Sequence, residues 1–313
     1  MSTLGATLRA AGRPLLIPYV TGGITDDWTD YLVACQDAGA DAIEVGLPFS
    51  DPMLDGTTIQ RASDRALARG ATAGGILADL AAVSSRLTVP LIVMTYANLA
   101  LRLGAPRLAA AGVRGLIVPD LPLEESPPLE AAAAEAGIDL ILLAAPSTPE
   151  ARLREICRRS RGFVYAVSVM GTTGERDALA STAADLVRRV RRAGTNARSM
   201  PEPPPAPSTV PAPPTAPAPP TAPAPPTAPA PPTAQATPAA LPVLIGFGVS
   251  TPAQAAEAGR AGDGVIVASA LMRRVLDGAV PDELRVTVAA LRTALDLGVS
   301  SGTPYAEVSG DRR

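Results

Sequence analysis

Eight short aliphatic runs, each followed by an alanine- and leucine-rich segment with helical spacing, constrain the fold of this chain most strongly. Continuously apolar runs are typical of parallel strands that are covered on both faces. Eight such strands alternating with helices predict a single-domain α/β fold, the (β/α)8 or TIM barrel. An open doubly wound sheet of five or six strands is the alternative, but no G-x-G-x-x-G motif follows the first run. The predicted strands cover residues 15–20, 42–45, 91–95, 115–118, 139–143, 163–167, 243–246 and 264–268.

The helical segments tend to stop at a glycine, the residue best suited to a left-handed helix end. We therefore expect this conformation after five of the predicted helices, at Gly39, Gly70, Gly137, Gly194 and Gly262. The predicted helices cover residues 26–38, 58–69, 73–86, 106–111, 124–136, 149–159, 183–192, 252–261 and 283–297.

Residues 200–240 differ from the rest of the chain, because they consist mostly of proline, alanine and threonine and contain near-perfect APPTAP repeats. Such a segment cannot bury a core, so it is predicted to be a disordered, polyproline-like insertion. It separates residues 1–199, with six strands, from residues 241–300, with two strands and the last helices; residues 301–313 are expected to form a flexible tail. Because it follows a helix, it should lie on the amino-terminal face, away from the catalytic loops of a barrel.

Two residue types are absent, and their absence excludes whole classes of chemistry. The chain has no histidine, and all 27 basic residues are arginine. Without lysine it cannot form a Schiff base with a substrate or with pyridoxal phosphate. Without histidine it cannot form a Ser-His-Asp triad or an imidazole-ligated zinc site. We therefore expect chemistry to depend on carboxylates, tyrosine, serine, threonine or the backbone, with no metal.

Glu44 is the strongest candidate for acid–base chemistry. It lies near the end of the second predicted strand, so its carboxylate should point into the carboxyl-terminal mouth among aliphatic neighbours. Burial there raises the pKa of a carboxyl group toward neutrality and makes it a usable general acid or base. A strand-end glutamate bonded to backbone donors is an equally weighted alternative.

Further polar candidates follow the same and neighbouring strands. Asp55 is either a catalytic carboxylate or the cap of the following helix, and Asp51 before Pro52 fits a turn. Asp120 fits either a turn or a pocket. Three tyrosines lie on or near strand ends and either line a pocket or pack in the core: Tyr19, Tyr96 and Tyr165.

A phosphate site is predicted at the loops after strands seven and eight, where barrels commonly bind anions. Gly246-Phe247-Gly248 follows strand seven, and Ala268-Ser269 opens the helix after strand eight, so backbone amides and a hydroxyl group converge there. The segment ending in Gly174 follows strand six and could close over the anion as a lid.

These residues closely resemble a family signature. Glu44-Val45-Gly46-Leu47-Pro48-Phe49-Ser50-Asp51-Pro52 followed by Asp55-Gly56 is similar to the signature of tryptophan synthase alpha chains. The resemblance extends from about residue 10 to 295, except for the proline-rich insertion. Its other motifs are Pro18-Tyr19-Val20-Thr21-Gly22-Gly23, Tyr96-Ala97-Asn98, Pro119-Asp120-Leu121-Pro122, Phe163-Val164-Tyr165 and Gly246-Phe247-Gly248-Val249.

The resemblance implies a lyase that cleaves indole-3-glycerol phosphate to indole and glyceraldehyde 3-phosphate. It also implies a beta-chain partner in an α2β2 heterotetramer, with pyridoxal phosphate on the beta chain only. The family's catalytic carboxylates correspond to Glu44 and Asp55, and its strand-six tyrosine corresponds to Tyr165. Its phosphate-binding positions correspond to Gly174, Phe247, Gly248, Ala268 and Ser269.

Two alternatives to this function stay open: a stand-alone lyase that releases free indole, and a weakly active or non-catalytic partner that activates a beta chain. Ala268 stands where the family usually has glycine, so its methyl group is expected to crowd the phosphate. The net charge of −3 and the lack of a basic run predict no nucleic-acid partner. No apolar run approaches the roughly 20 residues that cross a bilayer, so we expect a cytoplasmic protein without a membrane segment.

Overall fold

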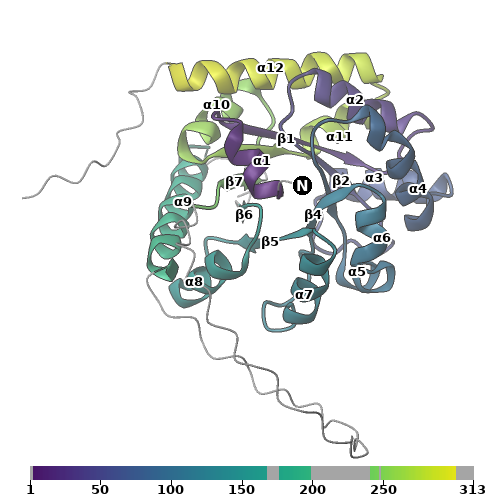
Figure 1. The fold of residues 1–313 in the computed structure, drawn as a ribbon. Coiled ribbons are helices and arrows are strands. Elements are labelled where there is room, and N and C mark those ends of the chain that lie inside the picture. The colour runs from purple at the N-terminus through teal and green to yellow at the C-terminus, as the bar shows by residue number, and fades with distance from the viewer. Residues whose placement is uncertain (1–2, 168–175, 199–239, 247, 301–313) are drawn as a thin grey trace, which may run out of the picture.

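A computed structural model describes residues 3–167, 176–198, 240–246 and 248–300. Eight parallel strands form a closed barrel in chain order, in which each strand pairs with the next and β8 pairs with β1. The predicted (β/α)8 barrel is therefore confirmed, and the open sheet is excluded (Figure 1). The strands are β1 Leu15–Thr21, β2 Ile43–Gly46, β3 Leu91–Met94, β4 Val113–Ile117, β5 Asp139–Ala144, β6 Val164–Val167, β7 Val243–Gly246 and β8 Gly264–Val267.

Helices surround the barrel, and the long helix α12 runs along its outside beside α2 and α10 (Figure 1). The helices are α1 Leu4–Ala10, α2 Trp28–Asp37, α3 Thr57–Ala68, α4 Ala73–Val83, the 3-10 turn η1 Ser84–Arg86, α5 Ala97–Leu103, α6 Ala105–Ala110, α7 Pro127–Glu135, α8 Glu150–Arg159, α9 Arg176–Arg198, α10 Pro252–Ala261, α11 Ser269–Leu276 and α12 Pro281–Ser300.

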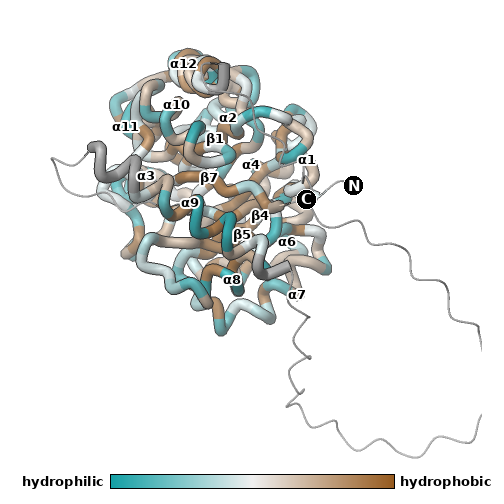
Figure 2. The backbone as a smooth tube through the Cα atoms, turned by 90° about the vertical axis from the view of Figure 1, so that its left-hand side faces the viewer, coloured by the Kyte–Doolittle hydropathy of each residue, from teal (hydrophilic) through white to brown (hydrophobic). Residues whose placement is uncertain are grey.

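The strands are largely buried on both faces, which explains why most of their residues are apolar. One face of each strand packs against the helices, and the other fills the barrel interior. The most hydrophobic stretches of the chain accordingly run through the middle of the molecule, around β4 and β7 (Figure 2). The interior is aliphatic apart from two aromatic residues and is made by Leu15, Ile17, Ala42, Ile92, Ile117, Ile141, Phe163, Tyr165, Leu244 and Ile266.

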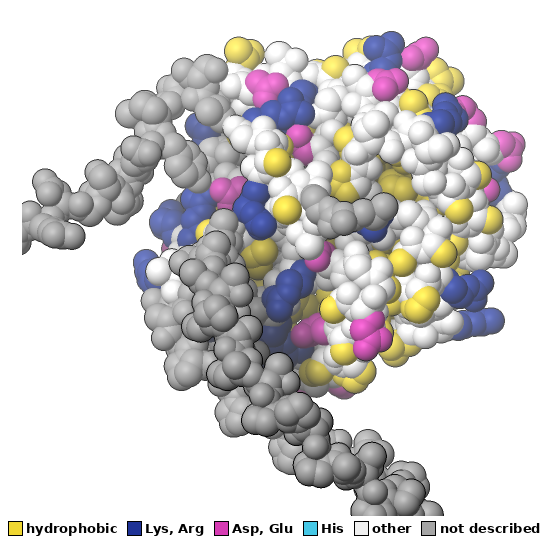
Figure 3. Space-filling model, in the orientation of Figure 1, with side chains coloured by type: hydrophobic (Ala, Val, Ile, Leu, Met, Phe, Trp, Pro, Cys, Tyr) yellow, Lys and Arg dark blue, Asp and Glu magenta, His cyan; other side chains and the backbone are white. Residues whose placement is uncertain are grey.

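Helix α1 closes the end of the barrel at which the strands begin. Its residues Leu4 and Leu8 pack with the interior cluster, and the backbone N–H of Gly5 donates a hydrogen bond of 3.1 Å to Asp139. In Figure 1 this helix lies across the middle of the ring of strands. On the same face, arginine and carboxylate side chains are interspersed around the rim (Figure 3). The carboxyl-terminal ends of the strands, at the opposite side, are not covered by this helix and can carry a ligand site.

Several helix predictions were incomplete or wrong at their ends. Helices α1 and α5 were not predicted. Helix α9 continues through Gly194 to Arg198, so the predicted left-handed end at Gly194 is wrong; the glycine lies within the helix, where a Cβ would be 3.8 Å from the Cys157 side chain. Positive φ angles confirm the left-handed conformation at Gly39, Gly70 and Gly137. Gly262 does end α10, but with φ −112°, so the left-handed prediction is wrong there. A glycine is required at position 262 because a Cβ there would lie only 2.9 Å from the Val243 carbonyl oxygen.

The proline-rich segment lies largely outside the described residues, as does the tail after Ser300. The described chain leaves α9 at Arg198 and resumes at Ala240, just before β7. This is a helix-to-strand connection, as predicted. Within the described residues no single helix has the length and hydropathy to cross a membrane, although the bent pair formed by residues 57–68 and 73–86 meets both criteria together.

Candidate active site

Glu44 lies on β2 and is 1% exposed. Its Oε2 atom accepts no hydrogen bond within the described part of the chain. Burial first, and then the nearby charge of Asp55, raise the pKa of Glu44 from 4.5 to about 8. The alternative of a carboxylate satisfied by backbone donors therefore does not hold for this oxygen, and the group is protonated near neutral pH.

Asp55 lies on the loop between β2 and α3 and is paired with Tyr96. The Tyr96 hydroxyl donates a hydrogen bond of 3.2 Å to Asp55 Oδ2, and it accepts one of 3.1 Å from the backbone N–H of Leu54. Burial raises the pKa of Asp55, and the hydrogen bond from Tyr96 partly opposes that shift. Asp55 does not cap α3, because Gly56 occupies the N-cap position with no side-chain cap. Its carboxylate is therefore available to a ligand.

Tyr96 is itself fixed by packing and by its place in the chain. It precedes α5 directly and is only 6% exposed. Its ring stacks on Phe49 with a centroid distance of 4.9 Å. This contact ties the loop after β2 to the end of β3, so that the loop carrying Asp55 is held at the mouth.

Two further tyrosines, Tyr19 and Tyr165, extend over the barrel mouth, and each lies against a glycine of the neighbouring strand. Tyr19 on β1 is the Cα partner of Glu44, and Tyr165 on β6 is the Cα partner of Leu244. In each case the residue two positions after that partner is a glycine, Gly46 or Gly246, and a Cβ there would overlap the tyrosine hydroxyl. The two glycines therefore make room for two buried phenol groups at the mouth.

The predicted phosphate positions that the structure describes come together at the ends of β7 and β8, which are neighbours in the barrel. Gly248 has φ 87°, a conformation that favours glycine. Ala268 is the N-cap of α11 and Ser269 its first residue, and no side chain caps this helix. The amides at this helix start can therefore receive an anion. Gly174 and Phe247 lie outside the described residues.

Two other candidate carboxylates serve the loops. Asp120 accepts a hydrogen bond of 2.8 Å from the backbone N–H of Ala97, so it anchors the start of α5. Asp51 is exposed and accepts a hydrogen bond of 2.6 Å from Ser50. The contact of Asp120 with Ala97 and that of Asp55 with Tyr96 were not predicted, because each joins residues that are distant in the sequence and meet only in the folded loops.

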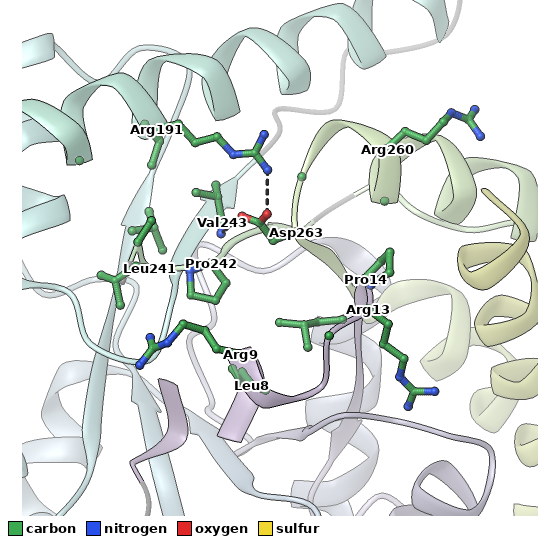
Figure 4. A pocket seen from close by; sticks show the side chains of 18 of the residues that line it. Leu8, Arg9, Arg13, Pro14, Arg191, Leu241, Pro242, Val243, Arg260 and Asp263 are labelled. Carbon is green, nitrogen blue, oxygen red and sulfur yellow. Dashed lines mark hydrogen bonds and ion pairs between the residues drawn. The ribbon is translucent and has the colours of Figure 1, made fainter. Parts of the chain in front are cut away.

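A large cavity of about 1290 Å³ opens at the opposite, amino-terminal end of the barrel. It is lined by parts of α1, α9, α10 and α12 and by the residues before β7 (Figure 4). Its size exceeds that of a typical ligand site, but it contains none of the candidate site residues. Arg191 is paired there with Asp263 at 2.7 Å, and Arg13 and Arg260 extend away from one another (Figure 4). We therefore place the chemistry at the carboxylates.

The fold and this site define a class: a (β/α)8 barrel with buried carboxyl groups and an uncapped helix start at the carboxyl-terminal end of its strands. The family model for the tryptophan synthase alpha chain matches residues 6–199 and 234–299. The chain thus belongs to the tryptophan synthase alpha chain family and is a lyase of tryptophan biosynthesis. The activity of this family is cleavage of indole-3-glycerol phosphate.

Individual relatives agree with this assignment. The tryptophan synthase alpha chain of Chloroflexus aurantiacus is 40% identical over 292 residues, which are 91% of this chain and 92% of that one. The alpha chain of Gloeobacter violaceus is 40% identical over 285 residues, covering 89% and 87% of the two chains.

Solved structures give the same result. A ligand-free tryptophan synthase from M. tuberculosis superimposes with a TM-score of 0.72 and 33% identity, covering 95% of this chain and 100% of that one. The tryptophan synthase a2b2 complex from Pyrococcus furiosus gives a TM-score of 0.69 and 31% identity, covering 90% and 98%.

Proposed function

We propose that Glu44 and Asp55 divide the cleavage of indole-3-glycerol phosphate between them, with Glu44 moving protons and Asp55 binding the indole ring. The observation that carries this proposal is the burial of the Glu44 carboxyl group and its raised pKa. Its carboxyl group is buried, one oxygen accepts no hydrogen bond from the described residues, and its pKa is raised to about 8. Such a group holds a proton at neutral pH and can release it to a substrate.

The retro-aldol reaction needs a proton on indole C3, because protonation makes the ring an electron sink and a leaving group. Glu44 supplies that proton. The C–C bond then breaks as a proton leaves the adjacent side-chain hydroxyl, and the oxygen becomes the carbonyl oxygen of glyceraldehyde 3-phosphate. Once it has lost its own proton, the Glu44 carboxylate can accept this second one. No Schiff base is required, in agreement with a chain that has no lysine.

Asp55 accepts a hydrogen bond from the indole N–H and stabilises the positive charge that develops when C3 is protonated. Its hydrogen bond from Tyr96 fixes the carboxylate and favours its charged form. Two carboxyl groups in different environments, one buried with an oxygen that is unpaired among the described residues and one that accepts a hydrogen bond from a phenol, are a common arrangement for acid–base chemistry.

The remaining site residues bind the rest of the substrate. Tyr19, Tyr96 and Tyr165 line the mouth around the indole and glycerol parts. The phosphate group binds to the amides of Gly248, Ala268 and Ser269 at the start of α11. From the sequence resemblance, Gly174 and Phe247 complete this phosphate site.

The partner is a tryptophan synthase beta chain in an α2β2 heterotetramer, and pyridoxal phosphate belongs to that partner alone. This is supported by the loop after β2, which projects two large apolar side chains, Met53 at 86% and Leu54 at 52% exposed. Exposed apolar side chains next to a site mark an interaction surface. The Pyrococcus furiosus relative is an a2b2 complex. We place the protein in the cytoplasm.

An assay of indole release from indole-3-glycerol phosphate tests the function. Glu44→Gln keeps the shape of the side chain but carries no acidic proton, so we expect indole release to fall at least about a thousandfold. Glu155→Gln is the matched control, because Glu155 is on the surface of α8, in an ion pair with Arg158.

Near-normal turnover of folded Glu44→Gln would remove Glu44 from the mechanism. The assay is run with and without a beta chain. Equal rates would favour the stand-alone lyase, and no turnover in either case would favour a non-catalytic partner.

A further inference from the structure

The hydroxyl group of Tyr19 lies at the mouth between the strand that carries Glu44 and the loop that carries Asp55. Tyr19 and Glu44 are Cα partners on neighbouring strands. The ring of Tyr19 extends over Gly46, so that its hydroxyl occupies the next inward position on β2 after Glu44. Since strands rise about 3.3 Å per residue, this position is about 6.6 Å further toward the mouth. The hydroxyl thus lies between the Glu44 position on β2 and the loop that follows β2.

Thr21 orients this hydroxyl. The Thr21 Oγ1 atom donates a hydrogen bond of 3.4 Å to Tyr19 Oη, and both side chains are buried. Because the phenol oxygen accepts from Thr21, its own proton is free to be donated elsewhere. No side chain or backbone group in the described ranges accepts that proton. A buried donor without an acceptor is costly, so the group is expected to have a partner in the working site.

The position of the hydroxyl and the charged groups around it indicate which partner this is. Burial raises the pKa of Tyr19 most, a hydrogen bond from Thr21 lowers it, and the charges of Asp55 and then Glu44 raise it. The hydroxyl itself lies beyond Glu44 along β2, at Gly46, on the side of the loop that carries Asp55, so the geometry favours Asp55 as its acceptor. The other titratable groups here are Tyr96 from the end of β3 and Tyr165 from β6.

One carboxylate oxygen of Asp55 can accept a further hydrogen bond. Tyr96 donates to its Oδ2 atom, whereas Oδ1 accepts no hydrogen bond from any residue that the structure describes. An ionised carboxylate can accept several hydrogen bonds, so a second phenol and an indole N–H can bind to it together.

We propose that Tyr19 is a positioning residue for the carboxylate pair. Its hydroxyl, oriented by Thr21, donates to Asp55 and keeps that carboxylate ionised, while its ring shields Glu44 from water and keeps it protonated. The hydroxyl and the ring of Tyr19 thereby keep Asp55 and Glu44 in different protonation states. This inference rests on the roles of Glu44 and Asp55 in the proposed function.

Two substitutions separate the hydroxyl from the ring. The pH profile of kcat/KM should rise through the pKa of Asp55 and fall near pH 8 through that of Glu44. Tyr19→Phe removes only the donor, so the acidic limb should move up by about one pH unit and the alkaline limb should stay. Tyr19→Leu also admits water to Glu44, so the alkaline limb should move down.

Three other variants complete the experiment. Thr21→Val should give a smaller upward shift of the acidic limb, since the phenol loses only its orientation. Gly46→Ala should displace the hydroxyl, because the added methyl group would overlap it. Tyr31→Phe is the matched control, because it removes another buried phenol that donates to the Ala279 carbonyl oxygen, at 2.7 Å. Neither limb should move in that control.

Carboxyl ¹³C NMR titration of Asp55, assigned with Asp55→Asn, measures the same shift without turnover. An unchanged Asp55 pKa and acidic limb in folded Tyr19→Phe would overturn the proposal. So would an upward shift of the alkaline limb alone, which would place the proton on Glu44. If the parent chain released no indole, the proposed function would fail, and the titration would still decide the role of Tyr19.

Discussion

Tyr96 donates a hydrogen bond to Asp55, with 3.2 Å between Oη and Oδ2, although 41 positions separate the two residues in the sequence. The same hydroxyl accepts a hydrogen bond from the backbone N–H of Leu54. One phenol thus fixes both the carboxylate and the loop that carries it. These two hydrogen bonds hold the Asp55 carboxylate in one orientation, as a binding role requires.

Tyr96→Phe should therefore weaken the site without unfolding the barrel. It removes a hydrogen bond to a charged group and the anchor of the loop, so we expect kcat/KM for indole release to fall about tenfold to a hundredfold. Loss of the donor should also raise the pKa of Asp55. Steady-state kinetics over a range of pH measures both effects. Unchanged kinetics in a folded variant would show that the loop is held by other contacts, such as the ring stacking with Phe49.

Burial of Glu44 should make the stability of the fold depend on pH. Its pKa is about 8 in the folded chain and about 4.5 when exposed. Between these values the folded state binds a proton that the unfolded state has lost, so the free energy of unfolding should fall as pH rises from about 4.5 to about 8. The contribution is about 1.4 kcal/mol per pH unit.

Urea unfolding of the parent chain and Glu44→Gln at pH 5, 6.5 and 8 tests this dependence. The difference in stability between the two should grow with pH in favour of Glu44→Gln, which has no charge to bury. Below about pH 4.5 the difference should be constant. A constant difference across the whole range would mean that Glu44 titrates at its ordinary pKa.

Ala268→Gly should lower KM for the phosphorylated substrate. The methyl group of Ala268 stands at the N-cap of α11, where the phosphate is proposed to bind. If crowding costs about 1.4 kcal/mol, its removal lowers KM about tenfold. Ala270→Gly in the same helix is the control for lost helix propensity. Identical KM values in the parent and Ala268→Gly would mean that the phosphate already fits beside the methyl group.

Deletion of residues 212–234 should leave kcat unchanged. The segment connects α9 to β7, and Thr195 in the last part of α9 and Ala240 before β7 line the cavity at the amino-terminal end, away from Glu44. Loop length also affects chain entropy only slowly. Indole release and thermal unfolding of the deletion variant provide the measurement. A large loss of kcat in a variant that unfolds at the normal temperature would contradict the predicted location.

The strands could be predicted from the sequence because they are largely buried on both faces and are therefore mostly apolar. Their ends were less certain: β4 begins at Val113, two residues before the predicted start, because Val113 pairs with Leu91 across a register irregularity that passes over Arg114. The short helix α5 was missed because Asp120, from the next loop, anchors its first residue. Contacts distant in the sequence decide such boundaries.

The sequence by itself determined the chemistry that is available. It restricted the chemistry to carboxylates, tyrosine, serine, threonine and the backbone, placed Glu44 near a strand end, and carried the family resemblance. Only the tertiary structure decided how those groups act on each other. Closure of the barrel buries Glu44 beside Tyr19, and folding of the next loop brings Asp55 to Tyr96. The physical reason is that burial and hydrogen bonding between distant residues set a pKa, and neither exists until the strands and loops have come together.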